Sequence, residues 1–170
     1  MNPNTSINTP IEPFICVSCT DYRYNDLLSK YLTMFQYYNI STAGGGLTLA
    51  MGNISPNLSQ SVLDNIEIAH SLSGSRKLYI INHQDCGAFR AFLPESGYPS
   101  YLGEDNRTEL NIHSYVLQGL RNMPDLHSMD VHLGIIDYNG TVADIEDGKW
   151  VIKFVGPGQD PRGLFFASSV

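Results

Sequence analysis

Short apolar runs alternate with segments of helical periodicity along most of this chain. Residues 13–18, 37–42 and 78–81 are rich in apolar, aromatic and β-branched side chains, which predicts strands. Residues 25–35 and 55–74 place apolar side chains three and four positions apart, as amphipathic helices do. Strands that alternate with helices form a mostly parallel sheet covered by those helices. We therefore predict an α/β fold with a mostly parallel central β-sheet and flanking helices.

The C-terminal third departs from this alternation. A helix that ends before Pro124 is predicted first, with Asn106 and Glu109 placed to form a capping box. Three segments of strand composition follow, at 131–137, 141–145 and 150–155. Asn-Gly and Asp-Gly turn signals separate these segments, and such turns join antiparallel strands. The sheet is therefore expected to carry an antiparallel C-terminal edge strand.

The length of 170 residues suits one domain. We expect a single domain over 1–170, with a flexible N-terminal arm at 1–12 and a C-terminal extension at 156–170. The N-terminal residues show no secretory pattern and no apolar run has the length of a membrane span, so we predict a cytoplasmic protein without a membrane partner. The net charge is -7 and the ten Lys and Arg residues are scattered, which argues against nucleic acid as a partner.

Two polar segments that contain cysteine follow predicted strands. Residues 19–23, Cys-Thr-Asp-Tyr-Arg, come after the strand at 13–18, and residues 83–87, His-Gln-Asp-Cys-Gly, come after the strand at 78–81. Ligands of parallel α/β sheets bind at the carboxyl ends of the strands, so we expect the two segments to meet there. Three cysteines in a chain of this size indicate reduced thiols or metal ligands rather than a disulfide framework.

Cys19, His83 and Cys86 form a donor set suited to Zn(II), which takes sulfur and nitrogen ligands tetrahedrally and keeps a fourth position open when it is catalytic. Two thiolates offset the charge of the zinc, so its bound water needs local help to ionise near neutral pH. Asp21 is placed to accept a hydrogen bond from that water or to occupy the fourth position itself. Arg23 can hold Asp21 in a bidentate ion pair that lowers its pKa and turns it away from the metal.

Cys16 and Asp85 are two further candidate ligands. Cys16 and Cys19 spell C-x-x-C and, with His83 and Cys86, allow a structural zinc site with four ligands and no open position. A step of three residues along a strand spans about 10 Å and reverses the facing side, so we favour a core position for Cys16. Asp85 could also be a ligand, but we favour a role in capping the next helix or in supporting the ligands.

The histidines other than His83 have no ligand-like neighbours in the sequence. They are His70, His113, His127 and His132. Isolated histidines are more often ordinary surface or core residues than ligands. A proton-transfer role for one of them stays open.

The two motifs, in this order and each after a strand, resemble those of the β-class carbonic anhydrases, which carry Cys-x-Asp-x-Arg followed by His-x-x-Cys-Gly. The turn at 43–45, Ala-Gly-Gly, looks like the family's Asn-Ala-Gly loop, and residues 134–137 resemble its late Gly-x-x-Tyr-Asp strand. Residues 13–147 follow the family's order. Tyr22 departs from the family pattern, because a small residue is common between the Asp and the Arg.

The resemblance implies reversible hydration of CO2 to bicarbonate and a proton by hydroxide held on zinc. It implies Cys19, His83 and Cys86 as the Zn(II) ligands, Asp21 as the residue that orients the water or closes the fourth position, and Arg23 as the residue that positions Asp21. It also implies a homodimer or a dimer of dimers, with the cleft built partly at the subunit interface. Two alternatives stay open: a hydrolase of carbonyl sulfide or carbon disulfide with the same zinc site, and a non-catalytic zinc-binding module.

Overall fold

The computed structural model describes residues 12–100 and 105–155 of the chain. Six strands form one sheet in the order β2-β1-β3-β4-β5-β6. They are β1 (Phe14–Ser18), β2 (Tyr37–Ser41), β3 (Lys77–His83), β4 (Asp130–Ile136), β5 (Val142–Glu146) and β6 (Lys149–Phe154). The first four strands pair in parallel, whereas β5 and β6 are antiparallel. The predicted fold class is confirmed, with a two-stranded antiparallel hairpin at the C-terminal edge.

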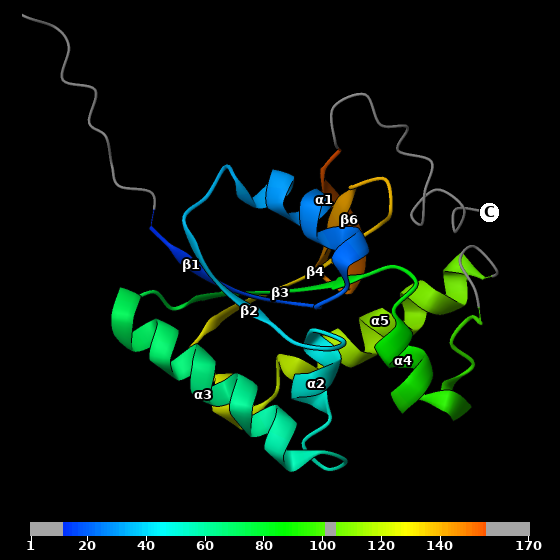
Figure 1. The fold of residues 1–170 in the computed structure, drawn as a ribbon, viewed down its shortest axis with the longest axis horizontal. Coiled ribbons are helices and arrows are strands. Elements are labelled where there is room, and N and C mark those ends of the chain that lie inside the picture. The colour runs from blue at the N-terminus through cyan, green and yellow to red at the C-terminus, as the bar shows by residue number, and fades with distance from the viewer. Residues whose placement is uncertain (1–11, 101–104, 156–170) are drawn as a thin grey trace, which may run out of the picture.

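The helices lie on both faces of the sheet. They are α1 (Tyr22–Leu32), α2 (Gly46–Ala50), α3 (Pro56–Ser73), α4 (Gly87–Phe92) and α5 (Asn106–Leu120), with short 3-10 turns η1 (Pro94–Ser96) and η2 (Pro124–Leu126). Figure 1 shows α1 on one face of the sheet and the other four helices on the opposite face. The fold is therefore a three-layer α/β arrangement in which both faces of the central strands are covered.

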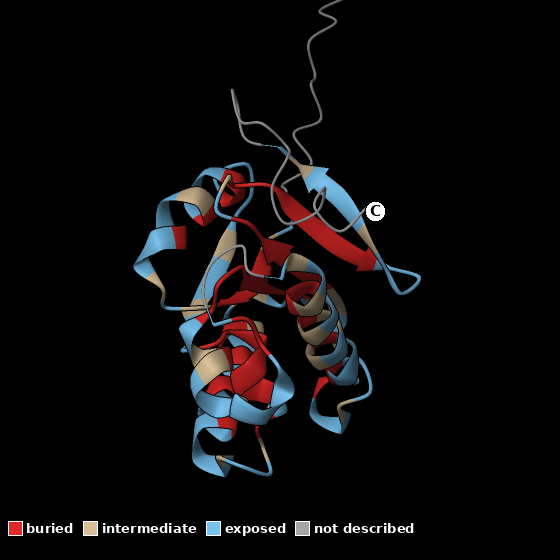
Figure 2. Cartoon of the chain, turned by 90° about the vertical axis from the view of Figure 1, so that its right-hand side faces the viewer, coloured by how far each residue is buried: buried red, intermediate tan, exposed pale blue. Residues whose placement is uncertain are grey.

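Every residue of β1 is buried. Because successive residues of a strand point to opposite faces of the sheet, this burial means that both faces of β1 are covered. Ile15 and Val17 join the apolar core under α3 and α5. Phe14 and Cys16 join the core under α1. Figure 2 shows the buried strands in the middle of the molecule, with exposed residues on the outer sides of the helices. This double burial explains why β1 has a continuous apolar sequence rather than an alternating one.

The C-terminal hairpin is buried on its inner strand alone. The first four residues of β5 are buried, whereas β6 is mostly exposed at the edge of the sheet (Figure 2). Lys149 and Lys153 lie on β6, and charged side chains are a common feature of edge strands because they discourage pairing with another chain.

Two local predictions differ from the structure. Asp105, rather than Asn106, is the N-cap of α5, and its Oδ1 accepts a hydrogen bond from the Thr108 backbone N–H at 3.0 Å. Glu109 is buried and its side chain turns inward, so the predicted capping box is wrong. The helix α2 was not predicted, because five residues after a glycine run are too few to show helical periodicity.

The predicted terminal segments fall largely outside the described part of the chain. Of the predicted N-terminal arm, Glu12 alone is described, and the whole predicted C-terminal extension at 156–170 lies outside the described residues. Within the described ranges, no helix is both long enough and apolar enough to cross a membrane.

Candidate metal centre

The three predicted zinc ligands come together at the carboxyl ends of two neighbouring strands. Cys19 follows β1, His83 is the last residue of β3, and β1 and β3 pair in parallel. Cys86 lies directly before α4. One ligand atom from each residue can be chosen so that all three lie within 4.8 Å of one another. The structure thus brings together residues that are 64 and 67 positions apart from Cys19, as the strand order predicts.

The turn between His83 and Cys86 depends on the backbone of Asp85. Asp85 has a φ of 58°, in the left-handed region that L-residues rarely adopt outside Gly, Asn and Asp. This conformation reverses the chain between the end of β3 and the start of α4, so that the two side chains face the same point. Such a conformation persists only when the surrounding structure holds it.

His83 presents one ring nitrogen to the two cysteines. Its Nδ1 lies 2.7 Å from the backbone oxygen of Gln84, so Nδ1 carries the proton and donates it. The other nitrogen, Nε2, is buried and has no hydrogen-bond partner among the described residues. The Tyr24 ring packs on the imidazole at 4.2 Å between ring centres. A buried, unprotonated nitrogen beside two sulfurs fits a metal ligand, with the orientation fixed by the bond at Nδ1.

The two cysteine side chains interact, and their pKa values shift in opposite directions. The Cys86 thiol, the His83 ring and the Gly44 backbone N–H, 3.2 Å from the sulfur, lower the pKa of Cys19 to about 4. The pKa of Cys86 is raised, because its thiol is the donor to Cys19 and because it is buried. One thiolate is therefore formed readily near neutral pH, and the thiolate is the form that binds metals.

The glycine turn before α2 is needed for the contact between the Gly44 backbone N–H and the Cys19 sulfur. Gly44 and Gly45 have φ values of 82° and 55°. A Cβ at Gly45 would lie 3.0 Å from Asn82 Oδ1 and 3.3 Å from the Cys19 backbone nitrogen. Glycine permits both the left-handed backbone and the close approach to Cys19.

Asp21 and Arg23 form the bidentate pair predicted from the sequence. Arg23 Nε lies 3.0 Å from Asp21 Oδ1, and Arg23 Nη2 lies 2.6 Å from Oδ2. These hydrogen bonds lower the pKa of Asp21, which is therefore ionised at neutral pH. Asp21 Oδ2 lies 3.9 Å from His83 Nε2, yet Asp21 is not a member of the cluster formed by the three ligand atoms. The carboxylate therefore stands beside the candidate metal position and is held by Arg23.

Asp85 supports the site from a second direction. Its Oδ2 accepts from Arg23 Nη1 at 2.5 Å, its Oδ1 accepts from Arg90 Nη2, and its backbone oxygen accepts from Arg23 Nη2 at 2.9 Å. Burial acts to raise the pKa of Asp85, but the two arginines outweigh it and the pKa lies below its usual range. The N-cap of α4 is Cys86, so the predicted capping role of Asp85 is wrong, whereas the predicted role in supporting the site agrees with these contacts.

Cys16 lies in the core as predicted. It is fully buried in the apolar cluster under α1, and burial raises the pKa of its thiol to about 12. It is not part of the cluster of ligand atoms formed by Cys19, His83 and Cys86. A protonated thiol in an apolar cluster is a packing residue rather than a metal ligand.

Sequence reasoning missed a buried polar network that lies behind the ligands. Its side chains are Tyr98, Glu109, His113 and Asn82. From the sequence, Glu109 is expected in a capping box and His113 as an ordinary surface or core histidine. Burial raises the pKa of Glu109, against the opposing effects of the Tyr98 hydroxyl and the Asp85 N–H, and burial lowers the pKa of His113. The one signal in the sequence was a pair of polar residues four positions apart on an otherwise amphipathic helix.

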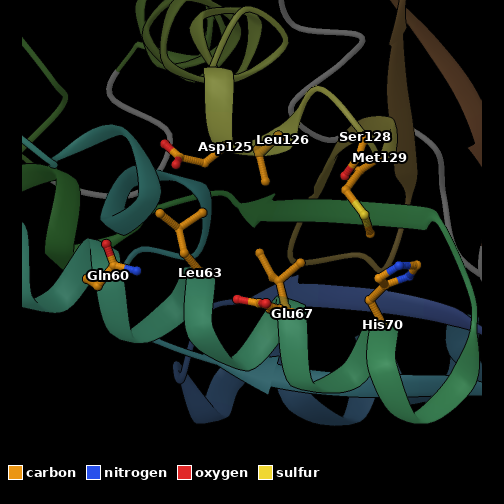
Figure 3. A pocket seen from close by; sticks show the side chains of 9 residues that line it. Gln60, Leu63, Glu67, His70, Asp125, Leu126, Ser128 and Met129 are labelled. Carbon is orange, nitrogen blue, oxygen red and sulfur yellow. The ribbon is translucent and has the colours of Figure 1, made fainter.

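An open hollow of about 390 Å³ lies against the candidate metal centre. Its lining includes Cys19, Asp21, Arg23 and Cys86, with Ala43 and other small residues beside them. A separate hollow of about 290 Å³ lies between α3 and the segment before β4, where His70 lies opposite Met129 (Figure 3). The second hollow contains none of the candidate ligands, so we place the chemistry at the first.

The fold is that of the β-carbonic anhydrases. The β-carbonic anhydrase CcaA is 16% identical over 84% of both chains, with a TM-score of 0.57. A tetrameric β-carbonic anhydrase from the filamentous ascomycete Sordaria macrospora is 14% identical over 82% of this chain and 83% of its own, with a TM-score of 0.52. The β-carbonic anhydrase CafD of the filamentous fungus Aspergillus fumigatus is 12% identical over 82% of this chain and 92% of its own, with a TM-score of 0.51.

Comparisons of sequence add nothing to this likeness. No protein-family model matches the chain, and no curated protein matches it. At identities of 12 to 16%, the likeness shows the fold alone. A shared fold does not determine function, which depends on the residues of the site.

Proposed function

We propose that this protein is a zinc-dependent carbonic anhydrase that catalyses the reversible hydration of CO2 to bicarbonate and a proton. The observation that carries the proposal is the unpartnered Nε2 of buried His83 beside the sulfurs of Cys19 and Cys86. The Asp21 and Arg23 pair stands next to these three atoms. The fold supports the proposal, because β-carbonic anhydrases are among the solved structures that share it.

Cys19, His83 and Cys86 would hold the zinc. Bound there, zinc would lower the pKa of a water molecule and so supply the nucleophile that adds to CO2 near neutral pH. Two thiolates and a neutral imidazole match the preferences of Zn(II) for sulfur and nitrogen, and three protein ligands leave a position for water.

Asp21 would orient the water, and Arg23 would control Asp21. The Asp21 carboxylate is ionised, and it can accept a hydrogen bond from water through a lone pair that Arg23 leaves unused. Because Arg23 binds both carboxylate oxygens, it opposes movement of Asp21 into the metal position. The arrangement described here therefore favours the state in which the fourth position is open. A closed state would require Asp21 to break the bidentate pair.

We also propose a homodimer or a dimer of dimers located in the cytoplasm, with CO2 and bicarbonate as the small-molecule ligands and neither nucleic acid nor membrane as a partner. The tetrameric state of the Sordaria macrospora enzymes supports the assembly. The open hollow at the site leaves room for a neighbouring subunit to complete its lining. Light scattering coupled to size exclusion measures the assembly: a mass of two or four chains is expected, and a monomer at micromolar concentration would contradict it.

The two alternatives make different predictions. A structural zinc site with four ligands needs Cys16. This residue is buried in the apolar cluster under α1 and is not among the grouped ligand atoms of Cys19, His83 and Cys86. Hydrolysis of carbonyl sulfide or carbon disulfide would use the same three ligands and differs in the substrate alone. The hydrolase is therefore distinguished by its substrate, and the structural site is distinguished by whether zinc binding needs Cys16.

Stopped-flow CO2 hydration with a pH indicator tests the proposed activity. Zinc-loaded protein should accelerate hydration at pH 8 and above, Cys86→Ser should abolish both zinc binding and activity, and Cys16→Ala should keep both. Release of sulfide from carbonyl sulfide without CO2 hydration would replace the proposal with the hydrolase. Loss of zinc in Cys16→Ala would replace it with the structural site.

A further inference from the structure

Four buried polar side chains connect the two segments that carry the candidate ligands. Tyr98 contacts the segment of His83 and Cys86, and Asn82 contacts the glycine turn that approaches Cys19. Glu109 and His113, both from α5, complete the set. All four are between 0 and 8% exposed. Each of them would be costly to bury without partners, so the way their hydrogen bonds are satisfied is informative.

The Tyr98 hydroxyl is satisfied in every direction. It accepts from the Cys86 backbone N–H at 3.0 Å and donates to Glu109 Oε1 at 2.6 Å. His113 Nε2 lies 3.0 Å from the Tyr98 hydroxyl oxygen. A hydroxyl offers one donor and two acceptor positions, so His113 must donate from Nε2. The backbone of a candidate metal ligand is thereby fixed to two side chains of α5.

The same assignment continues through His113 to the other ligand segment. With Nε2 protonated, His113 Nδ1 must accept, and Asn82 Nδ2 lies 3.2 Å from it as a donor. Asn82 Oδ1 then accepts from the Gly46 backbone N–H at 2.9 Å. Gly46 opens α2, directly after the turn in which Gly44 N–H contacts Cys19. One neutral histidine thus connects both ligand segments.

Glu109 holds the strained residue between the ligands. Its Oε1 accepts from the backbone N–H of Asp85, whose φ is 58°. The Asp85 carbonyl oxygen is bound from the other side by Arg23. The N–H and the carbonyl oxygen of Asp85 are therefore both hydrogen-bonded, and neither depends on a metal ion for its hydrogen bond.

We propose that Tyr98, Glu109 and His113 are positioning residues that preorganise the zinc site by fixing the Cys86 segment and the glycine turn at a set separation before zinc binds. This inference rests on the proposed function for the identity of the metal. Outer partners of metal ligands commonly change metal affinity by about 10- to 100-fold. The expected role is to lower the cost of ordering the ligands when zinc binds.

Zinc affinity, measured by competition with a chromophoric chelator, tests the inference with Tyr98→Phe. The matched control is Tyr31→Phe, which removes another buried tyrosine hydroxyl from the opposite face of the sheet. Tyr98→Phe should weaken zinc binding about tenfold or more, while Tyr31→Phe should leave it within twofold of the unmutated protein. Equal affinities for the two variants would overturn the inference.

A pair of variants at Glu109 separates positioning from general stability. Glu109→Gln keeps an oxygen that accepts from Tyr98 and Asp85, whereas Glu109→Met removes it. The glutamine variant should bind zinc close to the level of the unmutated protein, and the methionine variant should resemble Tyr98→Phe. The absorption bands of bound Co(II), which report ligand geometry, should shift in the methionine variant and not in the glutamine variant. Unchanged bands and affinity in Glu109→Met would overturn the inference.

The outcomes distinguish this inference from the proposed function. If zinc binds and the variants weaken it but CO2 is not hydrated, the positioning role stands and the proposed activity fails. If CO2 is hydrated and the variants bind zinc as the unmutated protein does, the activity stands and the positioning role fails. Absence of zinc binding in the unmutated protein would overturn both.

Discussion

Arg23 and Asp85 form an ion pair beside the candidate metal centre, with 2.5 Å between Nη1 and Oδ2. Arg23 follows β1 and Asp85 follows β3, so the pair joins the two motif segments. The same guanidinium binds Asp21 through Nε and Nη2. The position of Asp21 therefore depends on Arg23, and the position of Arg23 depends in turn on Asp85. The rigid planar fork of an arginine is suited to holding two carboxylates at once.

Replacement of Arg23 by lysine should separate charge from geometry. A lysine ammonium keeps the positive charge but cannot bind Asp21 and Asp85 in a fixed planar arrangement. We expect Arg23→Lys to bind zinc normally and to lose roughly 10- to 100-fold in kcat/KM for CO2 hydration. Steady-state kinetics at matched zinc content measures this loss. A variant that keeps full activity would show that the fork geometry is not used.

Asp85 offers a matched pair of substitutions. Asp85→Asn keeps a residue type that tolerates the left-handed backbone but loses the negative charge shared by Arg23 and Arg90. Its activity should fall roughly tenfold or more, and the free energy of unfolding at neutral pH should fall as well, because the ion pairs that lower the pKa of Asp85 stabilise the folded state. Asp85→Ala loses the charge and also strains the backbone, which should cost about 1 to 2 kcal/mol more. Equal unfolding free energies of the two variants, measured in urea, would contradict a strained turn at Asp85.

Gly46 is predicted to be required for packing rather than for backbone freedom. A Cβ at Gly46 would lie 2.8 Å from Ile80 Cγ2 and 2.9 Å from Leu117 Cδ2, both in the core. Gly46→Ala should therefore destabilise the protein by about 1 to 3 kcal/mol. Gly119 in α5 is the control, because a Cβ there meets nothing within 4 Å among the described residues. Gly119→Ala should stabilise by roughly 0.5 to 1 kcal/mol, and thermal unfolding of both variants checks the contrast.

Asp144 should make stability depend on pH. Burial raises the pKa of its carboxyl, and the opposing effects of Lys153, His132 and the Tyr79 hydroxyl do not cancel it. The folded state therefore keeps this proton to a higher pH than the unfolded chain does. The protein consequently loses stability from this group as the pH rises from about 4 through the raised pKa.

Asp144→Asn removes that titration and keeps the shape of the side chain. The free energy of unfolding of the variant relative to the unmutated protein should therefore increase as the pH rises from 4 to 7. Urea unfolding at several pH values measures the difference. A difference that stays constant over this range would show that Asp144 does not titrate differently in the two states.

The sequence allowed the sheet and the three candidate ligands to be predicted because both leave local patterns. The apolar runs of β1 and β3 and the motifs directly after them are contiguous in the chain. Asp21 and Arg23 were predicted as a pair because they are two residues apart, and the structure shows that pair.

The residues behind the ligands could not be predicted in the same way. Tyr98 is 12 residues from Cys86 and Asn82 is 36 residues from Gly46, and these hydrogen bonds form only after the helices pack on the sheet. Glu109 fitted a local capping pattern, but Asp105 takes the cap and leaves Glu109 free to turn toward Asp85. The local capping pattern at Glu109 is therefore overridden by a buried hydrogen bond to Asp85, which forms only in the tertiary structure.

The coordination sphere of bound zinc, measured by X-ray absorption at neutral and at high pH, tests the central claim most directly. We expect two sulfur ligands, one imidazole nitrogen and one lighter donor that exchanges with solvent. The lighter donor should remain when Asp21 is replaced by asparagine, because water rather than the carboxylate fills the open position. A shell of three sulfurs and one nitrogen would contradict the account, because it would make Cys16 a ligand and close the site.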